Sequence, residues 1–176
     1  MLDSGTISAL TSEKEAKEGE KPVKTAKIKL NAELNEGAEY SVKITLVTSN
    51  SKRVYYYTRV KLYKNGHLSE KLDYVRWFRE SALNKINQES VEKNLETKSN
   101  ADTSTFAHTD IHSSWKMVSW GDLQPQMIAE LPPTITDFYE GTASVVLSYL
   151  VQMDVGSGME QYMVREAFRF LYTDIR

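Results

Sequence analysis

Cysteine is absent from this chain of 176 residues. Its absence excludes disulfide bonds, thiol nucleophiles, and zinc or iron–sulfur sites with cysteine ligands, but it does not determine the cellular compartment. Long apolar runs are absent too, and none approaches the ~20 residues of a membrane-spanning helix. Residues 1–26 lack the apolar core of a secretory signal peptide. We therefore expect a soluble fragment that reaches a membrane only through a segment outside this sequence.

A strong net charge is also lacking, because 22 Lys and Arg residues face 24 Asp and Glu residues. The formal net charge of −2 gives no overall attraction to nucleic acid or to an anionic membrane, so we expect no nucleic-acid partner. No Gly-x-Ser-x-Gly elbow is present, and the three histidines stand in no recognisable triad. The sequence thus predicts no catalytic residue and no cofactor. Whether the protein is an enzyme stays open, and a non-enzymatic function is the preferred interpretation.

The first 26 residues predict a disordered linker. From Ser12 they read Ser-Glu-Lys-Glu-Ala-Lys-Glu-Gly-Glu-Lys-Pro, which mixes both charges with glycine and proline and offers little to a core. A polar linker that starts abruptly at Met1 suggests an expressed fragment of a larger protein. The remaining residues, 27–176, have the length and composition of a single α+β domain.

The β-rich section of this domain covers residues 27–66. Apolar and polar side chains alternate in three stretches, as they do in half-buried strands. These predicted strands are 27–34, 40–47 and 54–63. In the second strand the side chains expected to point inward are Tyr40, Val42, Ile44 and Leu46. The Asn65-Gly66 pair is a strong hairpin signal and predicts a further short strand at 67–72.

The helical section covers residues 69–97. Apolar side chains recur there at intervals of three and four, which predicts an amphipathic helix. These side chains are Val75, Phe78, Ala82 and Ile86. A break near 87–90 and a second helical piece ending at about 97 should follow. Residues 115–120 are predicted as a short strand, and 126–131 as a connection to Pro132-Pro133.

The C-terminal section, residues 134–175, predicts a three-stranded antiparallel meander. Its strands are expected at 134–139, 142–153 and 160–172, with a Gly-Ser-Gly loop before the last one. One face of the last strand is rich in aromatic residues and should face the core. This face comprises Tyr162, Val164, Glu166, Phe168, Phe170 and Tyr172. Glu166 interrupts it and is expected at the open end of the sheet or in the wall of a cavity.

Three groups of residues are candidate sites. If residues 108–112 are extended, His108, Asp110 and His112 point the same way and form a weak candidate metal site, without a recognisable fourth ligand. The alternative is that they make polar contacts in a loop. Trp115 and Trp120, with Glu166, are candidates for lining a pocket between helix and sheet. The alternative is that the two tryptophans are packing residues in the core or at its rim.

The third candidate is an interaction surface on the third predicted strand. It consists of Tyr55, Tyr57, Arg59, Lys61 and Tyr63. Interleaved aromatic and basic residues bind single-stranded nucleic acids in some sheets, but the acidic composition of this chain favours contact with a protein. The other alternative is an ordinary solvated strand face on which Lys and Arg stems cover tyrosine rings.

A helix followed by a meander with long final strands resembles the NTF2-like fold, a cone-shaped α+β fold. The resemblance rests on Thr142–Met153, the Gly-Ser-Gly loop and Glu160-Gln-Tyr-Met-Val-Arg-Glu-Ala-Phe-Arg-Phe-Leu-Tyr172, and it covers about residues 70–176. The pattern is similar to accessory domains of membrane-anchored, extracytoplasmic proteins of Gram-positive bacteria. It implies a helix packed on a strongly bent antiparallel sheet (NTF2-like or cystatin-like), with the β-rich section as an extra N-terminal hairpin region.

Together these observations predict a non-enzymatic interaction or accessory domain of a larger, membrane-associated extracytoplasmic or cell-surface protein. Its partner would be another protein or a second copy of the chain. The alternative is a small-molecule-binding or hydrolytic NTF2-like domain with a pocket between helix and sheet. No catalytic residues of that family map onto this sequence.

Overall fold

The structure, a computed structural model, describes residues 4–5, 11–12, 24–25, 31–101 and 103–171. Two compact units divide the chain, unit 1 at residues 1–62 and unit 2 at residues 63–176. The boundary falls inside the stretch expected to form one domain, and the single domain stays a prediction. In the described parts of the chain, no helix has the length and apolar content that crossing a membrane requires.

Unit 1 is built on a long antiparallel hairpin. Strands β3 (Glu39–Val47) and β4 (Arg53–Lys61) pair continuously from Glu39 opposite Lys61 to Val47 opposite Arg53. The turn between them closes where the Thr48 amide donates to the Lys52 carbonyl oxygen at 2.9 Å. The strands predicted from alternation at 40–47 and 54–63 are thus confirmed to within two residues.

The predicted first strand and the linker are only partly described. Residues 31–34 lie outside any strand, and residues 26–30 lie outside the described residues, as does most of 1–26. Within that N-terminal region the short strands β1 (Thr11–Ser12) and β2 (Lys24–Thr25) pair antiparallel with each other.

Unit 2 begins with a long helix where a short strand was predicted. Helix α1 spans Leu68–Asn84, so the strand predicted at 67–72 is wrong. The Asn65-Gly66 turn leads into a helix because His67 adopts a left-handed conformation (φ 47°) and the apolar residues that follow recur with helical spacing. Gly66 fits closely against Phe138, where an added Cβ would lie 2.5 Å from the ring.

The buried side of α1 carries two cations among its apolar residues. Val75 and Ala82 are buried as predicted, and Lys71 and Arg79 are buried with them. Ile86 is half exposed because the helix ends before it, at Lys85 with φ 56°. The predicted second helical piece is the single turn α2 (Gln88–Glu92).

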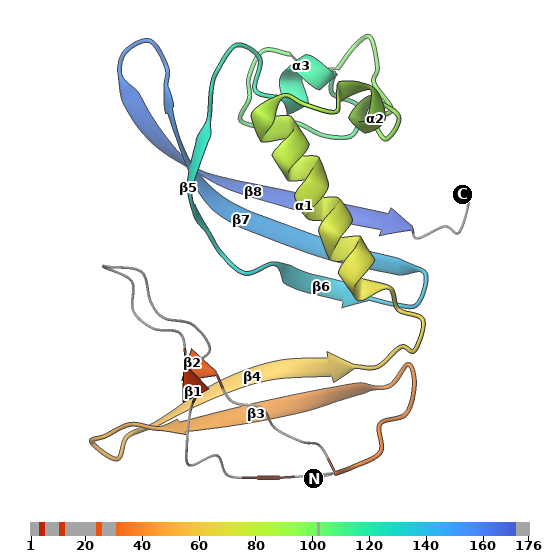
Figure 1. Cartoon of the computed structure of the whole chain (residues 1–176), viewed down its shortest axis with the longest axis vertical. Coiled ribbons are helices and arrows are strands. Elements are labelled where there is room, and N and C mark those ends of the chain that lie inside the picture. The colour runs from red at the N-terminus through yellow and green to blue at the C-terminus, as the bar shows by residue number, and fades with distance from the viewer. Residues whose placement is uncertain (1–3, 6–10, 13–23, 26–30, 102, 172–176) are drawn as a thin grey trace. The chain divides into compact units, whose positions relative to one another are not determined.

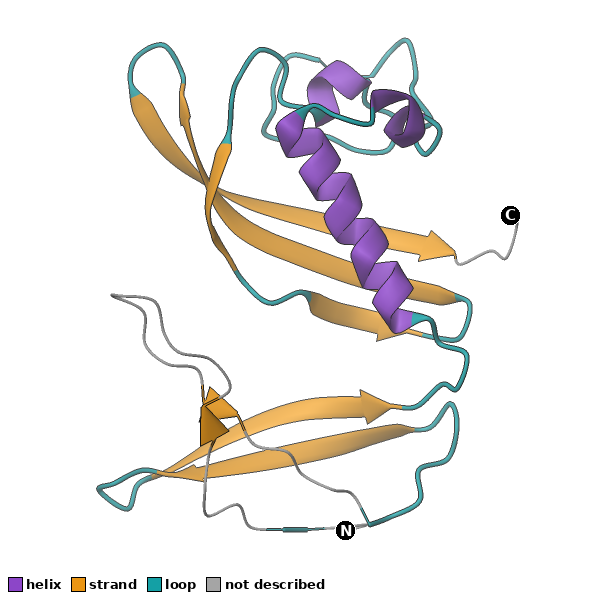
Figure 2. Cartoon of the chain, viewed as in Figure 1, coloured by secondary structure: helices purple, strands orange, loops and turns teal. Residues whose placement is uncertain are grey.

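Residues 115–120 form a helical turn instead of the predicted strand. Helix α3 spans Trp115–Val118 and is capped by the side chain of Ser114, which accepts a hydrogen bond from the Met117 amide. A helix of four residues is too short to show a helical periodicity, so the apolar residues of this stretch match neither pattern. Helices α2 and α3 lie near the C-terminal end of α1 (Figure 2).

The sheet of unit 2 is organised around one central strand. Strands β5 (Gln126–Glu130), β6 (Thr134–Phe138), β7 (Thr142–Asp154) and β8 (Met159–Leu171) are all antiparallel to their neighbours. β8 pairs with the whole length of β7, whereas β5 and β6 follow one another along its other edge. Between β5 and β6, the Leu131 amide still donates to Ser148, and Pro132-Pro133, which has no amide donor, interrupts the pairing.

The predicted meander of β6, β7 and β8 is therefore confirmed, and β5 was missed. The 126–131 stretch was predicted as a connection because Pro125 and Pro132-Pro133 hide a strand of only five residues. Figure 1 shows α1 lying across one face of this sheet. The combination of helices with antiparallel sheets confirms the α+β class.

The core of unit 2 lies between α1 and the inner face of β7. Every second residue of β7 from Ala143 to Met153 is buried. The aromatic face of β8 lies beside them, with Phe168 opposite Val145 and Val164 opposite Tyr149. The predicted core face is thus confirmed in its middle, while Tyr162 is 41% exposed and Tyr172 lies outside the described residues.

Candidate functional site

The β3–β4 hairpin presents two chemically different faces. The pairing register places the same set of residues on one side throughout, because side chains alternate with a period of two. The tyrosine–cation face comprises Glu39, Ser41, Lys43, Thr45, Val47, Arg53, Tyr55, Tyr57, Arg59 and Lys61. The apolar face comprises Tyr40, Val42, Ile44, Leu46, Val54, Tyr56, Thr58 and Val60.

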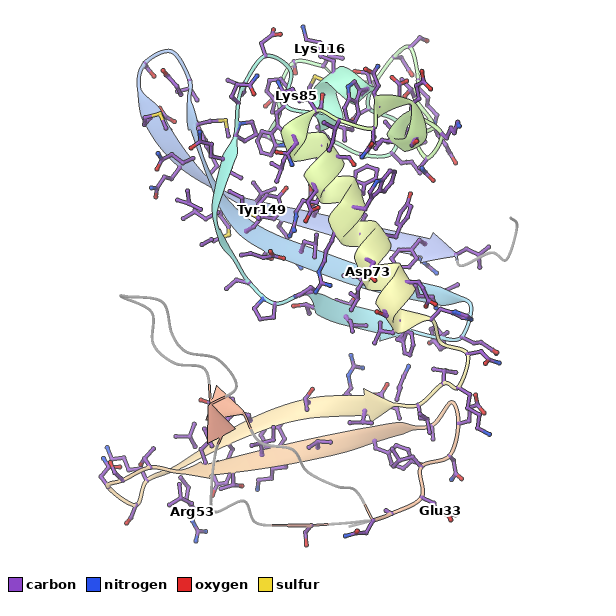
Figure 3. All side chains as sticks on the ribbon, viewed as in Figure 1. Glu33, Arg53, Asp73, Lys85, Lys116 and Tyr149 are labelled. Atoms are coloured by element: carbon purple, nitrogen blue, oxygen red, sulfur yellow. The ribbon has the colours of Figure 1, made fainter. Side chains whose placement is uncertain are left out.

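On the tyrosine–cation face, rings and charges contact one another across the two strands. The Lys43 Nζ atom lies 4.4 Å from the centroid of the Tyr55 ring, a cation–π contact. Tyr57, at the centre of β4, is 71% exposed. Figure 3 shows Arg53 at the turn end of the hairpin.

Glu39 is held by two cations of the facing strand. Its carboxylate lies 3.3 Å from Arg59 and 3.4 Å from Lys61. Desolvation raises the pKa of Glu39, but the hydrogen bonds from Lys61 and Arg59 outweigh it and hold that pKa below its ordinary value.

Four of the five residues predicted as an interaction surface lie on the tyrosine–cation face of β4. They are Tyr55, Tyr57, Arg59 and Lys61.

The fifth predicted surface residue, Tyr63, lies elsewhere. β4 ends at Lys61, and Tyr63 belongs to unit 2. Its ring packs edge-on against Phe138 at 5.4 Å between centroids and contacts Tyr139 at 6.4 Å. Tyr63 is therefore a packing residue of unit 2, because the chain leaves the strand before the alternation reaches it.

The apolar face was predicted to point inward, and it is exposed. Ile44 is 42% exposed, Leu46 47% and Tyr56 53%. The alternation correctly separates the two faces, but among the described residues β3 and β4 form a sheet of two strands, and large side chains on both of its faces are exposed. Sequence reasoning missed this surface because an exposed apolar face has the same pattern as a buried one.

The histidine stretch does not assemble a metal site. Residues 108–112 form a loop in which the Asp110 side chain accepts a hydrogen bond from the His112 amide at 2.8 Å, so the extended conformation that would align the three side chains is absent. The His112 ring instead lies 3.1 Å from the Glu96 carbonyl oxygen and 3.2 Å from Lys98 Nζ. Among the described residues, no group of three or more His, Asp or Glu side chains is placed to hold a metal ion.

The candidate pocket-lining residues lie in separate places. Trp120 packs against the core of unit 2, and Trp115 begins α3. Beside α3 there is an open pocket of about 610 Å³, but none of the three predicted residues lines it. Its lining is Thr103, Phe106, Ser114, Lys116, Met117, Gly121, Asp122 and Leu123.

Glu166 belongs to a polar cluster between helix and sheet that the sequence did not reveal, in which Arg79 and Tyr149 are buried, Glu166 is half-buried and Glu130 is exposed. The cluster consists of Arg79 on α1, Glu130 on β5, Tyr149 on β7 and Glu166 on β8. The Arg79 guanidinium donates to Glu130 at 2.6 Å and lies 5.7 Å from the centroid of the Tyr149 ring. Figure 3 shows Tyr149 on the sheet beneath α1. No pattern in the sequence marks Arg79, because an amphipathic helix is read from its apolar residues.

Three polar atoms of this cluster are buried without a hydrogen-bond partner among the described residues. They are Arg79 Nε, the Tyr149 hydroxyl and Glu166 Oε2. Burial, reinforced by the adjacent Glu166, raises the pKa of Tyr149 far above its usual range. Burial also raises the pKa of Glu166, and Tyr149 and the charge of Arg79 offset only part of that effect.

The comparisons with known proteins leave the family open. No protein-family model matches the chain, and neither the curated proteins nor the solved structures contain a significant match.

Proposed function

We propose that this chain is a non-enzymatic protein-interaction module that works through the β3–β4 hairpin. The observation that carries the proposal is the exposure of large apolar and aromatic side chains on both faces of one two-stranded sheet. The most exposed of these are Leu46, Val47, Tyr55, Tyr56 and Tyr57. Contiguous exposed apolar surface of this kind is typical of protein–protein interaction sites.

The energetics of a hairpin support the same proposal. An isolated two-stranded hairpin is at best marginally stable in water, because neither face is shielded and few side chains pack. A partner that covers one face would remove apolar area from water and stabilise both strands together. Tyrosine and arginine, which are enriched at protein interfaces, dominate β4.

We further propose that unit 2 is an NTF2-like scaffold with a strongly bent sheet, in an accessory domain of an extracytoplasmic, membrane-associated bacterial protein. Support for the scaffold comes from the single long helix packed on an antiparallel sheet with two long final strands. The cellular location rests on the sequence resemblance alone. Fractionation of the encoding organism with an antibody against the chain tests it, and recovery in the cytoplasm would refute it.

Photo-crosslinking tests the interaction function. A photoreactive phenylalanine replaces Tyr57 in one variant and Tyr139, an exposed tyrosine of unit 2, in the control. Both variants are irradiated in an extract of the encoding organism. Discrete protein adducts at position 57, competed by excess wild-type chain and absent at position 139, are the expected result. An absence of adducts at position 57 refutes the hairpin as the site.

The polar cluster favours a second candidate function, a small-molecule-binding or hydrolytic domain with its site between helix and sheet. The buried Arg79 and Tyr149 and the half-buried Glu166 bring a cation, a hydroxyl and a carboxyl group together beneath α1. Native mass spectrometry of the purified chain near neutral pH tests it directly. Retained mass that is lost in Glu166→Gln supports this second function, whereas a bare mass together with no thermal shift in a metabolite panel counts against it.

A further inference from the structure

We propose that the outer edge of β4 binds an extended acidic protein segment, which adds to the hairpin as a third strand and alternates acidic with apolar residues. This inference rests on the proposed function and specifies the chemistry of the partner. Three observations carry it: the form of the β4 edge, the charge on one face and the apolar character of the other.

The edge of β4 has the form that strand addition requires. β4 pairs with β3 through nine consecutive residues without a register shift, and it contains neither proline nor glycine. In the part of the chain that the structure describes, no strand pairs with its other edge. An extended edge presents a regular row of amide and carbonyl groups, on which an added strand forms main-chain hydrogen bonds.

The charge on the tyrosine–cation face selects an acidic partner. This face carries four cations and one carboxylate, although the whole chain has a net charge of −2. Three of the cations, Arg53, Arg59 and Lys61, lie on β4 itself, and Glu39 lies on β3, away from the outer edge. Opposite charges on neighbouring strands stabilise pairing, and like charges directly opposite destabilise it. Carboxylates on an added strand would therefore lie beside Arg53 and Arg59.

The opposite face determines the alternate residues of the partner. Successive side chains of a strand point to opposite faces, so every second residue of an added strand lies beside the apolar face. There it meets Val54 and Tyr56, which are 39% and 53% exposed. Apolar side chains at these positions would be buried against them. The expected segment thus reads acidic, apolar, acidic, apolar over about the length of β4.

The same charges disfavour a second copy of β4 as the occupant. In an antiparallel pair of β4 strands centred on Tyr57, Arg53 lies opposite Lys61 of the second copy. Tyr55 in turn lies opposite Arg59 of the second copy. Two cations therefore face each other at both ends of such a pair. Their repulsion disfavours pairing of two β4 strands, whereas the same cations attract an acidic strand.

A synthetic peptide tests the proposal on the full chain. The probe is a fluorescein-labelled peptide of the length of β4, Glu-Val-Glu-Val-Glu-Val-Glu-Val-Glu. The first control has the same composition, with the glutamates grouped at one end. The second control is the alternating peptide N-methylated at every second residue, which keeps its charge but removes main-chain donors. It is made in two versions, one methylated at the odd residues and one at the even residues, because only one edge of an added strand pairs with β4. Affinity is measured by fluorescence anisotropy. The alternating probe is expected to bind at least about ten-fold more tightly than either control, because only it combines strand pairing with alternating contacts.

Matched variants locate the binding on β4. Arg53→Glu with Arg59→Glu is expected to weaken the probe at least about ten-fold, since it replaces attraction with repulsion. The control, Arg165→Glu with Arg169→Glu on the exposed face of β8, makes the same change in net charge at another strand and should bind the probe like the wild type. Circular dichroism of both variants checks that the strands remain.

The outcomes distinguish this inference from the proposed function. If position 57 gives protein adducts but the alternating probe neither binds nor competes, the acidic-strand inference is overturned and the interaction function stands. If neither adducts nor probe binding occur, both fail. If an oligothymidylate or heparin of equal charge displaces the probe and N-methylation has no effect, the face binds polyanions without strand pairing, and the inference is overturned.

Discussion

The ammonium group of Lys71 donates a hydrogen bond to the carbonyl oxygen of Glu140 at 2.8 Å. Lys71 lies in the first turn of α1, and Glu140 lies in the turn between β6 and β7. The same ammonium group also reaches the carbonyl oxygens of Tyr139 at 3.1 Å and Thr142 at 3.5 Å. One buried lysine thus fixes the start of the helix to a reversal of the sheet.

Replacement of this lysine is expected to destabilise unit 2. Lys71→Met keeps most of the side-chain volume but removes the charged donor of these part-buried hydrogen bonds, and a hydrogen bond to a charged group contributes about 1.5–3 kcal/mol. Urea unfolding followed by tryptophan fluorescence measures the change, since Trp77, Trp115 and Trp120 all lie in unit 2. Lys93→Met, at an exposed lysine, is the matched control. Equal stability of the two variants would contradict the anchoring role.

The Arg79–Glu130 pair predicts a non-additive pair of substitutions. The Arg79 side chain is 3% exposed and that of Glu130 32%, so Arg79→Leu removes the counter-charge of a partly exposed carboxylate and is expected to cost about 1.5–3 kcal/mol. Arg79→Leu combined with Glu130→Leu should recover part of this loss, because the partner left without a counter-charge is removed as well. A double-mutant cycle measured by urea unfolding gives the coupling. Additive losses would indicate that the pair does not interact in solution.

Glu166 predicts a pH dependence of stability. Because burial raises its pKa in the folded state, the folded protein holds this proton more tightly than the unfolded chain. The free energy of unfolding should therefore decrease as the pH rises from the unfolded-state pKa through the folded-state pKa of Glu166. The cost of ionising this carboxyl group is fully present only above its folded-state pKa.

Glu166→Gln removes this dependence. We expect the variant to be more stable than the wild type at neutral pH, with the difference shrinking as the pH falls towards the unfolded-state pKa. Unfolding curves at several pH values measure the difference, and Glu89→Gln, at an exposed glutamate, should run parallel to the wild type. If the free energy of unfolding of the wild type exceeds that of Glu166→Gln, and does so most strongly at neutral pH, the ionised carboxylate is stabilising and the prediction is wrong.

The contact between Gly66 and Phe138 predicts a steric defect. In Gly66→Ala the new methyl group meets the ring at 2.5 Å, so the ring or the turn must shift, at an expected cost of about 1–3 kcal/mol. Gly141→Ala is the control, since its methyl group would lie 3.8 Å from Leu171, an ordinary contact. Thermal unfolding compares the two. If both alanine variants melt together, the turn adapts and the close approach carries no cost.

The tyrosines of the hairpin are expected to act in binding and not in folding of unit 2. Tyr55→Ser with Tyr57→Ser removes exposed rings, so the tryptophan-detected unfolding of unit 2 should be unchanged. Wild-type chain competes for the crosslinked adducts at position 57, and the double variant should not. Competition by the double variant at wild-type strength would place the contact on other residues.

Much of the local structure follows from the sequence because it depends on periodicity. Alternation separates the two faces of β3, β4, β7 and β8, and the spacing of Val75 and Ala82 identifies the buried side of α1. Predictions failed where a single contact outweighs the pattern. At Asn65-Gly66, His67 takes a left-handed conformation and the chain enters α1, and at 115–120 the Ser114 side chain caps the single turn α3 where a strand was predicted.

The candidate sites divide in the same way. The sequence identifies Tyr55, Tyr57, Arg59 and Lys61 as one face, because period two fixes which side chains share a side. It places Glu166 on the aromatic face of its strand, but Arg79 and Tyr149 reach it from other elements. The histidine stretch fails as a metal site because a turn at Asp110 replaces the extended backbone that the prediction assumed.

The sequence by itself therefore determined strands β3, β4, β6, β7 and β8 and most of helix α1, because these depend on periodicity among neighbours within a few residues, whereas it did not determine β5 or α3. Tertiary structure alone decided what covers each face. Non-local packing buries Lys71 and Arg79, whose charges would suit a solvated surface, and it pairs the short strand β5, flanked in the chain by Pro125 and Pro132-Pro133, with β7. It also leaves the apolar face of β3–β4 exposed, because an alternating pattern specifies two faces but not the partner that buries one of them.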